Sequence, residues 1–74
     1  MIRVVIIDDH TILRRGLEQI IAESGDMSMV GEAGTSAQGM HLLRETPCDV
    51  VLLDISLPDR NGVETLKLVR KEFP

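Results

Sequence analysis

Apolar residues along the chain recur at two different spacings, and this alternation predicts strands and helices in turn. Residues 4–7 form a continuous β-branched run bounded by charge, which is typical of a parallel strand buried on both faces. Residues 50–53 form a second apolar, unalternating run of the same kind. Residues 27–30 are a weaker strand candidate, because Met and Ser are not strong strand formers. The pattern therefore predicts three strands.

The segment after the first strand has the spacing of an amphipathic helix. Its apolar residues fall at i, i+4, i+7 and i+8, and they are Leu13, Leu17, Ile20 and Ile21. Charged residues occupy the other positions. We expect this helix to end near Ser24 and Gly25, because glycine readily adopts the left-handed conformation that caps a helix.

Two further helices are expected after the second and third strands. Ser36 is the expected cap of the second helix, and Pro47 closes it. Its expected inner face consists of Ala37, Met40 and Leu43, with Leu42 as an alternative. The last helix is expected to stop at Pro74. Its expected inner face consists of Val63, Leu66, Val69 or Arg70, and Phe73. With right-handed crossovers, the order β-α-β-α-β-α predicts an α/β fold, an open parallel sheet with helices on both faces.

Composition and charge exclude several classes of function. Eight Lys and Arg against twelve Asp and Glu give a net charge of −4, so this segment is not expected to grip nucleic acid by itself. Cys48 is the only cysteine, which excludes an intrachain disulfide. The longest apolar runs are far shorter than the about 20 residues of a membrane helix. We therefore expect a cytoplasmic protein without a membrane partner.

Acidic residues follow two of the predicted strands directly. The first strand ends at Asp8 and Asp9, and the third ends at Asp54. Because the carboxyl ends of parallel strands lie at one edge of the sheet, the three carboxylates converge if these strands are neighbours. Like charges so close need a cation, and an all-oxygen cluster favours Mg²⁺. Such an ion binds and orients phosphoryl oxygens.

Simpler roles are available to the same residues. An Asp after a strand is often only a helix cap or a turn former, so Asp9 could merely cap the first helix. Against this, Asp8 and Asp9 are paired and Asp54 repeats the pattern. His10 is expected to open the first helix as a surface residue, and His41 is expected to face solvent.

These motifs resemble the receiver domain of bacterial two-component response regulators, and the likeness covers the whole chain. Asp8 and Asp9 resemble the acidic pair that holds Mg²⁺ in that family, and Asp54 matches the aspartate that accepts the phosphoryl group. Ser56 falls where the family donates a backbone carbonyl to the metal. Leu57, Pro58 and Gly62 match the loop that follows.

The resemblance is closest to receivers with a LuxR-type helix-turn-helix output. Those receivers open with a stretch like Asp8-Asp9-His10 followed by Arg14 and Gly16-Leu17, and residues 30–34 are similar too. The resemblance implies a phosphoacceptor module rather than an enzyme. Its implied partner is a sensor histidine kinase that phosphorylates Asp54, and DNA would be bound only by an output domain outside this chain.

Parts of the family pattern have no counterpart in the sequence. The family fold is flavodoxin-like, with five strands in the order 2-1-3-4-5, and its fourth and fifth strands end in Ser or Thr and in Lys. The only lysines, Lys67 and Lys71, lie in the last helix pattern. The resemblance thus implies a receiver truncated to three β-α units, residues 1–74 being its amino-terminal part. The third strand would then lack a partner on its outer edge, so we expect a homo-oligomer.

Two other classes of function stay open. A Mg²⁺-dependent phosphohydrolase of the haloacid dehalogenase kind would use an Asp nucleophile on a similar sheet. That class places a second acid two residues after the nucleophile, whereas His10 stands two residues after Asp8. The second class is a dimerisation module that keeps a receiver-like shape without phosphorylation. The three carboxylates argue against it.

Overall fold

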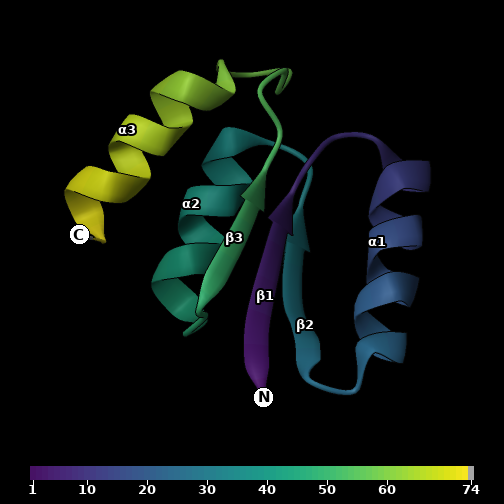
Figure 1. Cartoon of the computed structure of the whole chain (residues 1–74). Coiled ribbons are helices and arrows are strands. Elements are labelled where there is room, and N and C mark those ends of the chain that lie inside the picture. The colour runs from purple at the N-terminus through teal and green to yellow at the C-terminus, as the bar shows by residue number, and fades with distance from the viewer. Residues whose placement is uncertain (74) are drawn as a thin grey trace.

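Three parallel strands and three helices alternate along the chain, as the sequence pattern predicts. The computed structural model describes residues 1–73. The elements are β1 (Ile2–Ile7), α1 (Thr11–Ser24), β2 (Met27–Ala33), α2 (Ser36–Glu45), β3 (Val50–Leu53) and α3 (Gly62–Glu72). The strands lie in the order β2-β1-β3, and both pairings are parallel (Figure 1). None of the helices in this part of the chain has the length and apolar character that a membrane crossing requires.

Helices cover both faces of the sheet, so the central strand β1 is buried on each side. α1 lies on one face, and α2 and α3 lie on the other (Figure 1). Val4 and Ile6 pack with Ile21 of α1, whereas Val5 and Ile7 pack in a second cluster with Leu43 of α2. This two-sided burial explains why residues 4–7 are continuously apolar instead of alternating.

β3 is less buried than its sequence indicates. Its four residues are as apolar as residues 4–7, yet Val50 and Leu52 remain 42% and 39% exposed. Val51 and Leu53 point toward the α2 face, where they pack against the core cluster. In residues 1–73, β3 pairs only with β1, so its second edge and its α1-side face are open. The prediction of full burial was wrong for this strand.

The turn between α1 and β2 confirms one predicted cap, and the start of α2 corrects another. Gly25 has a φ of 81° at the end of α1, the left-handed conformation expected there. Thr35, not Ser36, is the N-cap of α2, because its side chain accepts a hydrogen bond from the Gln38 amide. Ser36 is the first helical residue and is buried.

The buried faces of α2 and α3 differ in part from the expected ones. Met40 and Leu43 of α2 are buried as expected, but Ala37 is exposed. On α3, Val69 packs against the core as expected. The rest of the predicted inner face was wrong, because Val63, Leu66 and Phe73 are exposed and Thr65 is fully buried. The helix ends at Glu72, and the stop predicted at Pro74 lies outside the described residues.

β2 runs three residues beyond the predicted strand. Gly31 and Glu32 are poor strand formers, but they pair with Val5 and Ile6 of β1 after a register irregularity. A Cβ on Gly31 would lie 2.9 Å from the methyl groups of Leu42, so a larger residue there would require the Leu42 side chain to shift.

Candidate functional site

The carboxyl ends of β1 and β3 lie side by side, which is the arrangement that convergence of the three carboxylates requires. Ile7 pairs with Leu53 in the parallel register, so the residues that follow each strand leave the sheet at the same point. The Asp54 amide donates a 2.9 Å hydrogen bond to the Ile7 carbonyl, and the Asp8 amide donates one of the same length to the Ala33 carbonyl. Backbone pairing therefore fixes the positions of both aspartates.

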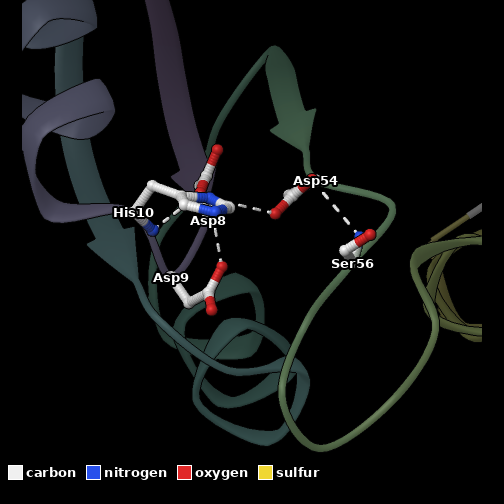
Figure 2. Close-up of polar contacts among 5 residues, drawn as sticks. All are labelled: Asp8, Asp9, His10, Asp54 and Ser56. Carbon is white, nitrogen blue, oxygen red and sulfur yellow. Dashed lines mark hydrogen bonds and ion pairs between the residues drawn. The ribbon is translucent and has the colours of Figure 1, made fainter.

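Four side chains gather at this edge of the sheet. Asp8, Asp9, His10 and Asp54 each offer one donor atom, and these four atoms lie within 4.8 Å of one another. Figure 2 shows the His10 ring between the three carboxylates. Asp54 lies at least 44 positions away in the sequence from the other three residues, which are consecutive. The predicted convergence of Asp8, Asp9 and Asp54 is thus found in the structure.

Asp8 shapes the turn that carries the next two residues. Its side chain is buried, and its Oδ1 accepts a 2.8 Å hydrogen bond from the His10 amide. His10 is the N-cap of α1 and makes no side-chain capping bond. The alternative that Asp9 only caps the helix is therefore wrong. The Asp9 carboxylate is partly exposed and does not cap the helix.

Asp54 carries the clearest sign of an incomplete polar site. Its side chain is 20% exposed, and its Oδ2 is buried without a hydrogen-bond partner. Its Oδ1 accepts a weak 3.3 Å hydrogen bond from the Ser56 amide (Figure 2). A buried carboxylate oxygen with no donor is costly unless a proton or a cation approaches it. Three carboxylates with one such oxygen fit a divalent cation with a preference for oxygen ligands.

His10 takes part in the cluster, which sequence reasoning missed. Its Nδ1 lies 2.7 Å from Oδ1 of Asp8, 3.2 Å from Oδ1 of Asp9 and 3.5 Å from Oδ2 of Asp54. The hydrogen bond to Asp8 raises the pKa of the imidazole, and the charges of Asp9, Asp8 and Asp54 add to this effect. The expectation of a surface residue at the helix start was correct, since the side chain is 62% exposed. Nothing in the local pattern indicated which way the ring turns.

The loop after Asp54 is held against α2 and α3. Leu57 is buried in the core, and Ser56 forms an isolated antiparallel bridge with Asn61. The Asp59 carboxylate accepts hydrogen bonds of 2.7 Å and 3.0 Å from the amides of Ser36 and Ala37. The loop that resembles the family pattern is therefore anchored at both ends.

A cavity of about 430 Å³ opens beside the carboxylates on the α1 side of β3. Asp8 and Asp54 line it together with apolar residues, namely Ile6, Leu17, Leu52, Leu53 and Ile55. This space leaves the Asp54 side chain accessible from outside the sheet.

Comparison with known proteins agrees with this geometry. The family model described as "Response regulator receiver domain" matches residues 4–74. The nitrate/nitrite response regulator protein NarL of Escherichia coli K12 is 41% identical over 69 residues, which are 93% of this chain and 32% of that protein. The chain thus spans about a third of the length of this relative.

Two solved structures share the fold over nearly the whole chain. The response regulator domain of Thermotoga maritima CheB matches at a TM-score of 0.94 and 38% identity, covering 100% of this chain and 55% of that one. A LuxR-family two-component response regulator from Aurantimonas sp. SI85-9A1 matches at 0.92 and 32%, covering 99% and 52%. On the family match and this shared fold, the chain belongs to the response regulator receiver domain family.

Proposed function

We propose that Asp54 is the phosphoacceptor of a two-component receiver and that a Mg²⁺ ion assists its phosphorylation. The observation that carries the proposal is the convergence of Asp8, Asp9 and Asp54, whose donor atoms lie within 4.8 Å at the ends of β1 and β3. Asp9 and Asp54 would ligate the ion directly, Asp8 mainly through water, and Ser56 through its backbone carbonyl. When bound, the ion supplies positive charge that offsets the phosphoryl oxygens.

The residues of the chain have distinct roles in this reaction. A carboxylate oxygen of Asp54 attacks the phosphorus of the donor, a new O–P bond forms, and the bond from phosphorus to the donor's leaving group breaks. Oδ2 of Asp54 accepts no hydrogen bond, and its contact with Nδ1 of His10 is long, at 3.5 Å. The backbone bond from the Asp54 amide to the Ile7 carbonyl holds the nucleophile in place.

The role of the whole protein follows from its relatives and is part of the proposal. The phosphoryl donor would be a sensor histidine kinase, and the phosphorylated receiver would control a DNA-binding output that lies outside these residues. The relation to NarL and to a LuxR-family regulator supports this output. The receiver would act in the cytoplasm as a signalling module, with no catalytic turnover of another substrate, and it would associate with a second copy.

A small phosphodonor tests the central assignment. Acetyl phosphate with Mg²⁺ should add one phosphoryl group to the longer regulator, detected as a mass increase of the intact protein, and should modify residues 1–74 alone far less, because no Lys of these residues follows a strand to offset the phosphoryl charge. The adduct should disappear in Asp54→Asn and persist in Asp26→Asn, a change at an exposed aspartate in the turn before β2. An adduct that survives Asp54→Asn, or that forms equally well without Mg²⁺, contradicts the proposal, and so does the absence of any adduct.

A further inference from the structure

His10 adds a nitrogen donor to a site that otherwise offers only oxygen. Its Nδ1 is 2.7 Å, 3.2 Å and 3.5 Å from carboxylate oxygens of Asp8, Asp9 and Asp54. The ring therefore occupies the space toward which all three carboxylates turn (Figure 2). A cation shared by these carboxylates would bind in the same space, within reach of the imidazole nitrogen.

The separation of the four donor atoms suits a single ion. They lie within 4.8 Å of one another, and two ligands on opposite sides of an ion with bonds of about 2.1 Å are about 4.2 Å apart. Small side-chain rotations would bring the donor atoms from the observed separation to the separation that a bound ion requires. His10 is 62% exposed, so its ring can turn without disturbing the core, whereas the aspartates at the strand ends are fixed by backbone hydrogen bonds.

We infer that His10 is a metal ligand and a selectivity residue of this site, which therefore favours transition-metal dications that accept nitrogen ligands, such as Ni²⁺, over Mg²⁺. The inference rests on the proposed function, because it concerns the same ion site. Imidazole is a good ligand for these metals, while Mg²⁺ prefers oxygen and keeps water. Binding through Nδ1 uses the lone pair of that nitrogen, so the 2.7 Å contact with Oδ1 of Asp8 is given up when the ion binds.

Calorimetric titration of the full chain with Mg²⁺ and with Ni²⁺ tests the inference at about pH 8, because protons compete less with the metal for an imidazole as the pH rises. In His10→Ala the Ni²⁺ affinity should fall by about tenfold or more, with a much smaller change in Mg²⁺ affinity. His10→Asn should behave in the same way, because its amide offers a similar shape without a comparable nitrogen ligand. His41→Ala, at the exposed histidine on α2, is the matched control and should leave both affinities unchanged.

A spectroscopic measurement on the unmutated chain gives an independent answer. Electron spin echo spectra of the Mn²⁺-loaded chain should show nitrogen modulation from a coordinated imidazole, and this signal should be lost in His10→Ala and kept in His41→Ala. An unchanged ratio of Ni²⁺ to Mg²⁺ affinity in both His10 variants, or no nitrogen signal, overturns the inference.

The failure of this inference differs from a failure of the proposed function. One outcome is that Mg²⁺ binding depends on Asp54 while the Mn²⁺-loaded chain gives no nitrogen signal. This outcome leaves the phosphoacceptor assignment intact and removes His10 from the ligand set. Ni²⁺ binding that depends on His10, without any Mg²⁺ binding, supports the ligand role and counts against the Mg²⁺-assisted function.

Discussion

Gly62 lies directly against the backbone of Asp54. A Cβ on Gly62 would overlap the carbonyl oxygen of Asp54 and would lie 2.5 Å from Cα of Ile55. The Gly62 amide also donates a 2.6 Å hydrogen bond to the Ile55 carbonyl. Glycine is therefore required at this position by the close approach of two backbone segments, and this approach fixes the chain as it leaves Asp54, the proposed phosphoacceptor.

Replacing Gly62 with alanine should destabilise the fold and displace Asp54. We expect a loss of about 1–3 kcal/mol of unfolding free energy, because the neighbouring atoms belong to the backbone and cannot rotate away. Urea unfolding followed by far-ultraviolet circular dichroism measures this, since the chain has no Trp or Tyr.

Gly16→Ala is the matched control for that experiment. Gly16 lies inside α1, and a Cβ there would meet no side chain and no backbone of another element within 4 Å. Alanine there should raise stability by about 0.5–1 kcal/mol through helix propensity. Equal effects at the two glycines would contradict the packing explanation.

Asp59 links the loop after β3 to the start of α2, and its removal should lower stability in a pH-dependent way. Hydrogen bonds from the Ser36 and Ala37 amides hold the pKa of this carboxyl below its usual range. A lowered folded-state pKa means that the stabilisation is present above the ordinary Asp pKa of about 4 and is lost as pH falls through the folded value. Asp59→Ala should therefore lower the thermal midpoint by a few degrees near neutral pH.

The difference between Asp59→Ala and the unmutated chain should shrink as the solution is acidified below about pH 4. Thermal unfolding by circular dichroism across that range checks it, with Asp26→Ala as the control at an exposed aspartate. A difference that is constant with pH would mean that the Asp59 charge does not stabilise the start of α2.

Asp9→Asn should weaken Mg²⁺ binding by about tenfold, because the variant removes one negative charge from the proposed ligand set. The fold should be unaffected, since Asp9 is partly exposed and does not cap α1. Calorimetry or NMR titration with Mg²⁺ measures the change, and Asp26→Asn again serves as the control. Identical affinities in Asp9→Asn and the unmutated chain would remove Asp9 from the site.

The strands and the acidic site were predictable because their signals do not depend on distant residues. Residues 4–7 are apolar at every position because both faces are covered, and an Asp directly after such a strand must lie at the sheet edge. The relation between Asp8 and Asp54 then needs only the assumption that β1 and β3 are neighbours. Their parallel register confirms that assumption.

The buried face of α3 was not predictable, because a polar pair replaces the expected apolar contact. The Thr65 hydroxyl lies 2.8 Å from Oγ of Ser36 and 3.2 Å from the Asn61 carbonyl oxygen, so its burial leaves no polar group unsatisfied. Val63 and Leu66 consequently face solvent. Hydropathy ranks valine and leucine above threonine, and it cannot anticipate a partner 29 positions away.

The His10 ring illustrates a second limit. Its backbone position at the start of α1 follows from the sequence, but its ring turns to Oδ1 of Asp8 at 2.7 Å and comes to lie 3.5 Å from Oδ2 of Asp54, which follows another strand. Only the assembled sheet edge brings the ring among the carboxylates.

The open side of β3 leads to the last prediction, which is that the chain self-associates. An apolar groove of about 250 Å³ runs between α1 and this strand. It is lined entirely by apolar residues, namely Ile2, Val4, Leu17, Ile20, Ile21, Met27, Val50 and Leu52. Within residues 1–73 the outer edge of β3 pairs with no strand, so its free backbone groups can pair with a second copy while the groove is covered.

Multi-angle light scattering should therefore find dimers or larger species at micromolar to millimolar concentrations, with dispersed proton NMR spectra showing that the chain is ordered. The double variant Val50→Lys and Leu52→Lys should shift the population toward monomer, because both side chains are already about 40% exposed and edge lysines oppose strand pairing. Ile12→Lys, at a residue 88% exposed on α1 and outside the groove, is the control and should not change the assembly. A well-dispersed monomer at high concentration would show that the three β-α units are self-sufficient and that the open edge of β3 is tolerated in water.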